Sequence, residues 1–153
     1  MRKIIYLFIV MLLLSGCSAQ NEDGVNQTEF SMNESINYKD ITYVVNDFEL
    51  IESEDFEGEM LLVSLTIENT STKSFEFSPL YFNLIDDKGE EHQYIYSYVN
   101  SETALEEQVI YANETVEGTL LFMLNNHSET YDLSFNQRVI VFDNQVFTVN
   151  LEK

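Results

Sequence analysis

Apolar and polar residues alternate along most of the chain after Ile41, with the period of two that is typical of β-strands. In segments 61–67 and 116–124, leucine, valine, isoleucine, phenylalanine and glycine fill every second position. Segments 131–135 and 147–151 repeat the pattern. Each segment has one apolar face and one mixed or polar face, as expected for two packed antiparallel sheets. The residues predicted to lie between the sheets include Leu65, Leu120 and Phe122.

The first strand changes phase, because its apolar residues are odd-numbered up to Val45 and even-numbered from Phe48. A β-bulge at Asn46-Asp47 would reconcile the two phases. The stretch 100–107 is the one place where helical turns are expected.

Turn-forming residues separate the strand segments. The sequence of Asp86–Gly89 predicts a hairpin with its glycine in the left-handed conformation, and Asp143-Asn144 predicts a two-residue hairpin. Pro79, the only proline, is expected at a strand start or a sheet edge. Seven or eight short strands predict an all-β protein, a two-layer antiparallel immunoglobulin-like β-sandwich.

The N-terminus has a different pattern. Arg2 and Lys3 precede an unbroken apolar run, Ile4–Leu14, which is too short to span a bilayer. Small residues and Cys17, the only cysteine, follow the run. A basic start, a short apolar run and small residues are typical of a secretory signal peptide.

The segment Leu14-Ser15-Gly16-Cys17 resembles the lipobox of bacterial lipoproteins. This resemblance implies that the cysteine sulfur receives a diacylglycerol and that a peptidase cuts just before it. We therefore predict a signal peptide over residues 1–16, lipidation at Cys17 and a location on the extracytoplasmic face of the cell membrane. No disulfide can then stabilise the exported domain.

Residues 17–37 are expected to be the lipidated cysteine and a flexible tether, because the stretch is polar and its apolar residues are scattered. Residues 38–153 are expected to form the sandwich domain. Removal of Arg2 and Lys3 leaves five basic residues against 27 acidic ones, a net charge of about −22. Such a charge repels nucleic acid, so nucleic-acid binding is excluded, and it favours cationic partners or divalent metal.

Three further segments carry a family resemblance: Leu61–Ser71, which closes on Glu-Asn-Thr; the Phe82–Glu91 hairpin; and Asn113–Phe122. Together they resemble the telokin-like, immunoglobulin-like domain of unknown function found in many Gram-positive lipoproteins. Ala112-Asn113 stands where that family usually has Pro-Gly, and asparagine tolerates the left-handed conformation that such a turn needs. The resemblance implies a sandwich fold and supplies no catalytic residues.

Two groups of residues are candidate binding sites. Acidic side chains crowd one turn, and oxygen ligands of this kind suit Ca²⁺, although a solvated hairpin loop explains the turn as well. The candidate metal ligands are Glu52, Glu54, Asp55 and Glu57, with Glu59 beside them. Alternating tyrosines would share one face of a strand and could stack on sugar or peptide, or could be half-buried packing under the loop that follows. These tyrosines are Tyr94, Tyr96 and Tyr98.

Enzyme chemistry has little support in the sequence. His92 and His127 are the only histidines, are expected on the surface, and have no nearby triad residues. We therefore predict a monomeric, non-enzymatic module without a cofactor that binds a protein or glycan of the cell envelope. A calcium- or ion-responsive module and, with less support, an envelope hydrolase are the alternatives.

Overall fold

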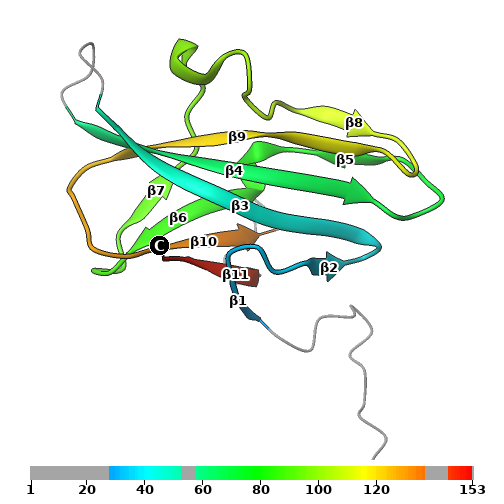
Figure 1. Ribbon diagram of the computed structural model, residues 1–153, viewed down its shortest axis with the longest axis horizontal. Coiled ribbons are helices and arrows are strands. Elements are labelled where there is room, and N and C mark those ends of the chain that lie inside the picture. The colour runs from blue at the N-terminus through cyan, green and yellow to red at the C-terminus, as the bar shows by residue number, and fades with distance from the viewer. Residues whose placement is uncertain (1–27, 53–57, 137–144, 153) are drawn as a thin grey trace, which may run out of the picture.

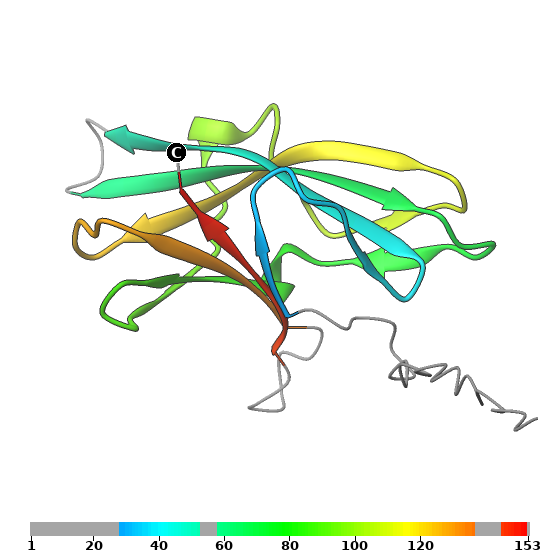
Figure 2. The ribbon, with the colours of Figure 1, turned by 60° about the horizontal axis from the view of Figure 1, so that its bottom comes forward.

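The computed structural model describes residues 28–52, 58–136 and 145–152. Their strands form two packed layers, which confirms the predicted all-β sandwich (Figures 1 and 2). One sheet has the order β1-β11-β10-β6-β7, the other has the order β2-β3-β4-β9, and a separate pair is β5-β8. The strands are β1 Glu29–Ser31, β2 Ile36–Tyr38, β3 Ile41–Glu52, β4 Glu59–Asn69, β5 Phe75–Phe77, β6 Phe82–Asp86, β7 Glu91–Gln93, β8 Gln108–Ile110, β9 Thr115–Leu124, β10 Tyr131–Asn136 and β11 Gln145–Leu151.

The core lies between the two sheets, where the period-two pattern placed it. Leu65, Leu120 and Phe122 are buried, as predicted. Aromatic rings fill the centre, and the rings of Phe135 and Phe147 stack with their centroids 4.8 Å apart. Such close packing in a hydrophobic interior supplies most of the folding free energy of a domain that has no disulfide.

Strand β3 contains the predicted bulge. Val45 pairs with Leu65 and Asp47 pairs with Ser64, so the register shifts across Asn46. Because of the extra residue, the apolar side chains after the bulge again point towards the core: Phe48 lies opposite Val63 and packs against the core.

Residues 29–38 belong to the sandwich, which corrects the prediction that the tether extends to residue 37. Strand β1 pairs in parallel with β11, and β2 pairs with β3. Ile36 is fully buried, and Phe30 and Met32 pack against the core. The apolar residues of this stretch therefore have partners: β1 pairs with a strand at the other end of the chain, and β2 pairs with the next strand.

The turns agree with their sequences in two places and differ in one. Gly89 has φ 77° and its N–H donates to the Asp86 carbonyl, as the hairpin prediction requires. Asn113 has φ 62°, so it takes the left-handed conformation. Pro79 begins a 3-10 turn, Pro79–Tyr81, between β5 and β6 rather than a strand. The predicted hairpin at Asp143-Asn144 lies outside the described residues.

Candidate functional site

The three tyrosines predicted to share one strand face do not lie on one strand. Strand β7 ends at Gln93, Tyr94 makes an isolated bridge to Phe122, and Tyr98 begins a 3-10 turn, Tyr98–Asn100. After Gln93 the chain leaves the five-stranded sheet and crosses to the edge of β9. The three tyrosines therefore do not alternate along a single strand. The helical turn predicted within 100–107 therefore occurs two residues earlier than expected.

Tyr94 is a structural residue. Its ring is half-buried and packs against the core, and its hydroxyl donates to the carbonyl of Leu105 at 3.3 Å. Burial and the nearby Glu106 carboxylate raise the pKa of Tyr94. The loop that follows the tyrosines thus covers Tyr94, which agrees with the interpretation of this residue as half-buried packing under that loop.

Tyr96 is open to solvent, with 62% of its surface exposed. The segment that carries it is held to β9 by backbone hydrogen bonds, in which Ile95 donates to Leu121 at 2.8 Å and Leu105 donates to Thr119 at 2.9 Å. Met123 of β9 is also exposed, whereas Leu121 is fully buried. Tyr96 is therefore an exposed aromatic ring on a well-supported backbone, a geometry suited to binding.

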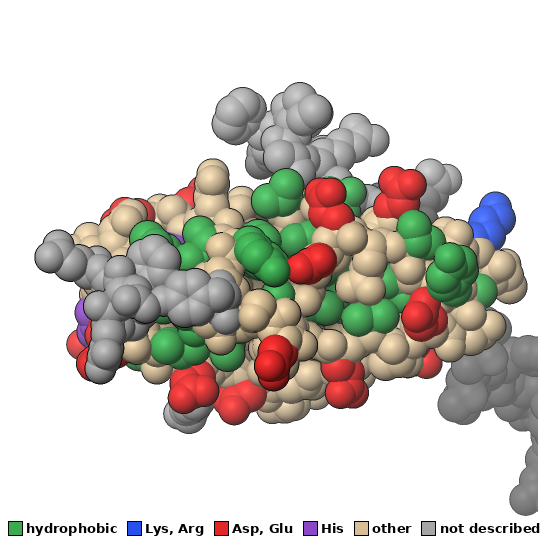
Figure 3. Space-filling view, turned by 90° about the horizontal axis from the view of Figure 1, so that it is seen from above, with side chains coloured by type: hydrophobic (Ala, Val, Ile, Leu, Met, Phe, Trp, Pro, Cys, Tyr) green, Lys and Arg blue, Asp and Glu red, His purple; other side chains and the backbone are tan. Residues whose placement is uncertain are grey.

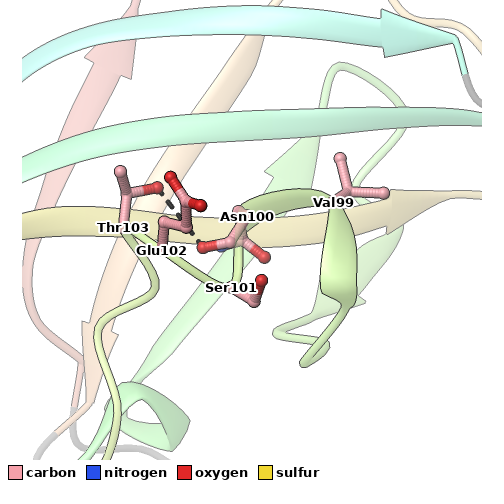
Figure 4. Close-up of a pocket in the computed structure, with 5 residues that line it drawn as sticks. All are labelled: Val99, Asn100, Ser101, Glu102 and Thr103. Atoms are coloured by element: carbon pink, nitrogen blue, oxygen red, sulfur yellow. Dashed lines mark hydrogen bonds between the residues drawn. The ribbon is translucent and has the colours of Figure 1, made fainter.

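The same segment forms a small hollow of about 330 Å³, lined by residues 99–103 (Figure 4). Asn100 is buried at its base and donates from Nδ2 to Thr119 Oγ1 at 3.1 Å, whereas its Oδ1 has no partner in the described structure. The carbonyl of Asn100 accepts the N–H groups of Thr103 and Ala104. These bonds close the turn on itself, so the hollow is the surface of a rigid loop tip.

Gly118 lets this loop approach β9. A Cβ at position 118 would lie 2.6 Å from the Thr103 carbonyl oxygen and 2.8 Å from Cγ of Leu105. Only glycine permits this close contact between β9 and the loop that supports Tyr96.

The acidic turn lies mostly outside the described residues. Glu52 and Glu59 pair at the ends of β3 and β4. Residues 53–57 are not described. Among the residues that are, no three histidine, cysteine, aspartate or glutamate side chains are grouped so as to hold a metal ion.

His92 is buried, which corrects its expected surface position. The side chain is fully buried, and its Nε2 lies 3.5 Å from Oδ2 of Asp86. The hairpin register sets His92 opposite Leu84 and so turns it inward. That register could have been inferred from the Asp86–Gly89 turn. His127, by contrast, is exposed, as expected, and its Nδ1 lies 2.8 Å from Oε2 of Glu59.

The Asp86 carboxylate is the acceptor at the centre of this cluster. It accepts N–H bonds from Lys88 at 2.9 Å and Glu90 at 2.8 Å, and Ser128 Oγ donates to it at 3.2 Å. Burial opposes its ionisation, but these donors and His92 outweigh burial, so the pKa of Asp86 is lowered. Ser128 and His92 both face Asp86, so the histidine does not link serine and aspartate as a catalytic triad would require. The cluster closes the hairpin.

Comparison with known proteins identifies the family. Residues 30–146 match the domain of unknown function DUF4352. The chain belongs to this family. No curated protein sequence matches the chain.

Solved structures with low sequence identity share the DUF4352 chain's fold. The yjhA protein of Bacillus subtilis has a TM-score of 0.62 at 15% identity, over 80% of this chain and 99% of that one. The secreted protein MPT63 of Mycobacterium tuberculosis has a TM-score of 0.63 at 13% identity, over 83% and 98%. A candidate lipoprotein of Staphylococcus aureus has a TM-score of 0.57 at 14% identity, over 77% and 87%. In the described part of this DUF4352 chain, no helix is long and apolar enough to cross a membrane.

Asn69, in the Glu-Asn-Thr motif of the DUF4352 chain, joins three segments of the fold. Its buried amide Nδ2 donates to the carbonyls of Lys73 and Ile110, and its Oδ1 accepts from the N–H and hydroxyl of Ser71. Its backbone carbonyl accepts the N–H of Asn113. The Glu-Asn-Thr segment and the turn at Asn113 therefore meet at one end of the sandwich.

Proposed function

We propose that this DUF4352 chain is a lipid-anchored, extracytoplasmic, immunoglobulin-like module that binds a protein or glycan of the cell envelope and catalyses no reaction. The membrane is a partner through the lipid on Cys17, and the domain acts as a monomer. The single observation that carries the proposal is Cys17 directly after Leu-Ser-Gly and a short apolar run.

Several features support this assignment. Structural neighbours include a secreted protein and candidate lipoproteins, although at low identity. The described residues contain no nucleophile bonded to a histidine, and the Ser128-Asp86-His92 cluster is buried in a hairpin. A domain of this kind contributes a surface rather than an active site.

Tyr96 is the residue that we assign to binding. Its exposed ring offers apolar area and a hydroxyl, and the hydrogen bonds to β9 hold its backbone in place before a partner arrives. Tyr94 supports the segment from within. Tyr98 stays a candidate from the sequence, since its side chain is not described.

Membrane fractionation tests the anchor. Cys17→Ser is expected to move the protein from the membrane to the medium or to leave uncleaved precursor, because the sulfur that receives the lipid is gone. Ser18→Ala is the matched control and should remain membrane-bound. A Cys17→Ser protein that stays in the membrane fraction at its mature size would contradict the assignment.

Site-specific photocrosslinking in whole cells tests the binding surface. A photoreactive phenylalanine at position 96 is expected to give a discrete crosslinked product, because the ring is the exposed part of a supported segment. The same residue at position 50, where Leu50 is also exposed, is the control. Equal products from both positions, or none from position 96, would remove Tyr96 from the binding surface.

A further inference from the structure

The two-stranded ribbon β5-β8 carries a second exposed surface, on which large hydrophobic and acidic side chains lie together. Six large hydrophobic side chains are exposed in the described residues, and three of them surround this ribbon. They are Val109 in β8, 46% exposed; Tyr111 directly after β8, 66% exposed; and Leu80 in the turn after β5, 52% exposed. Seen from above in Figure 3, hydrophobic and acidic side chains are interspersed over the face that includes β8 and β9.

Strand pairing places an acid beside an apolar residue on the outer side of the ribbon. Glu76 pairs directly with Val109, and both are exposed. Their neighbours Phe77 and Ile110 point the other way and are buried. The outer side therefore offers a carboxylate and a branched apolar side chain at the same point.

A hollow of about 300 Å³ lies at one end of this outer side. Glu76, Tyr81, Glu107 and Val109 line it, together with Phe77, Ser78 and Gln108. Ser78 Oγ donates to Oε1 of Glu107 at 3.1 Å, which orients that carboxylate. A third carboxylate, on Glu114, accepts the N–H of Tyr111 at 2.6 Å.

Among the described residues, no lysine or histidine forms an ion pair with Glu76 or Glu107. The whole chain has 27 acidic and seven basic residues, so the excess negative charge must be balanced from outside the molecule. A free cation would balance the carboxylates but would leave the exposed apolar side chains in water.

We propose that the β5-β8 ribbon, with its hollow, binds an extended segment of a partner protein in which basic residues (lysine or arginine) and apolar residues alternate at every second position, so that both kinds share one face. The aliphatic part of the long basic side chain lies along Val109 and Tyr81, and its charged end reaches Glu76 and Glu107. The apolar residues two positions before and after the basic residue lie on the same face and cover Leu80 and Tyr111. Opposite charge speeds the encounter, and burial of the apolar side chains holds the complex.

Peptide titration tests the proposal. The probe is a short blocked lysine-valine peptide, in which serine separates alternating lysine and valine so that both lie on one face, with a terminal tryptophan; it is added to the full chain in a non-ionic detergent. The chain has no tryptophan, so the peptide's fluorescence reports binding without background from the protein. Saturable binding is expected, and it should be lost when glutamine replaces the lysines of the peptide.

Variants separate this surface from general charge attraction. Glu76→Gln with Glu107→Gln should weaken binding roughly fivefold, because two exposed charge pairs are lost and each contributes a factor of about 1.5 to 5. Glu91→Gln with Glu129→Gln removes the same charge near the other hairpins and should change binding less than twofold. Leu80→Ser with Tyr111→Ser should weaken binding of the lysine-valine peptide and leave that of a lysine-serine peptide unchanged, because these exposed side chains meet only the valines.

Three results would overturn the proposal: no saturable binding, equal binding of the glutamine peptide, or equal weakening by both pairs of glutamate variants. The last result would show that only the overall negative charge attracts the peptide. None of them bears on the lipid anchor or on Tyr96, because the two proposals rest on different residues and different readouts.

Discussion

Gly118 and Leu105 lie so close together that a Cβ on the glycine would be 2.8 Å from Cγ of the leucine and 2.6 Å from the Thr103 carbonyl oxygen. The glycine thus allows the loop 94–105 to lie along the edge of β9. Because that loop carries Tyr96, a contact within the sandwich determines the position of a candidate binding residue.

Gly118→Ala should destabilise the fold by about 1–3 kcal/mol, because the added methyl group overpacks a contact that includes rigid backbone. Glu117→Ala, on the exposed face of the same strand, should change stability by less than about 0.5 kcal/mol. Urea unfolding of both proteins measures the difference. Equal stability of the two variants would mean that the loop can move away from β9 at little cost.

Phe122→Ala should cost roughly 3–5 kcal/mol, because the ring is fully buried between the sheets and its removal leaves a cavity. A domain of this size has only about 5–15 kcal/mol of stability in total. Denaturant unfolding checks the value. A loss below about 1 kcal/mol would contradict the burial of this ring in the core.

Asn69→Ala should destabilise by at least about 2 kcal/mol, because the Ile110 carbonyl then loses a buried donor and the Ser71 N–H loses its acceptor. Asn69→Asp should not rescue the fold, since a carboxylate cannot donate to the carbonyls of Lys73 and Ile110. Asn37→Ala, at an exposed position of β2, is the control. Thermal unfolding of the three variants should rank the control as the most stable.

Asp86 should contribute a stability that depends on pH. Its pKa is lowered in the folded state, so the stabilisation is present above the unfolded-state pKa and is lost as the pH falls through the lower folded-state value. Asp86→Asn should therefore lower stability at neutral pH and flatten the acid side of the stability curve. Asp87→Asn, at the exposed neighbouring position, is the matched control. A wild-type and an Asp86→Asn protein that lose stability in parallel on acidification would argue against this role.

Calcium should have only a salt effect on the protein, because carboxylates that repel one another are relieved by any added salt. The melting temperature in millimolar CaCl₂ should match that in NaCl of equal ionic strength. Alanine at Glu54, Asp55 and Glu57 should leave this result unchanged. A saturable calcium-specific rise that the alanine variants abolish would instead support the calcium-responsive alternative through linkage.

The sequence by itself determined the features that depend on neighbouring residues. Alternation of apolar residues placed Leu65, Leu120 and Phe122 between the sheets, and a change of phase located the bulge beside Asn46. Gly89 predicted its own turn, because left-handed backbone restricts the choice of residue. Lipidation of Cys17 also rests on neighbouring residues alone, and it remains a prediction.

Only the tertiary structure decided the features that depend on strands distant in sequence. Strand β1 forms because it pairs with β11. Since β11 lies more than a hundred residues later, the polar composition of the β1 segment alone suggested a tether. His92 combines both kinds of information: the local Asp86–Gly89 turn sets its hairpin register, whereas its burial depends on the tertiary structure that covers it. Tyr94 is covered and Tyr96 is exposed because the chain leaves β7 at Gln93 and continues along the edge of β9. The spacing of the tyrosines does not show which strand edge accepts the segment that follows.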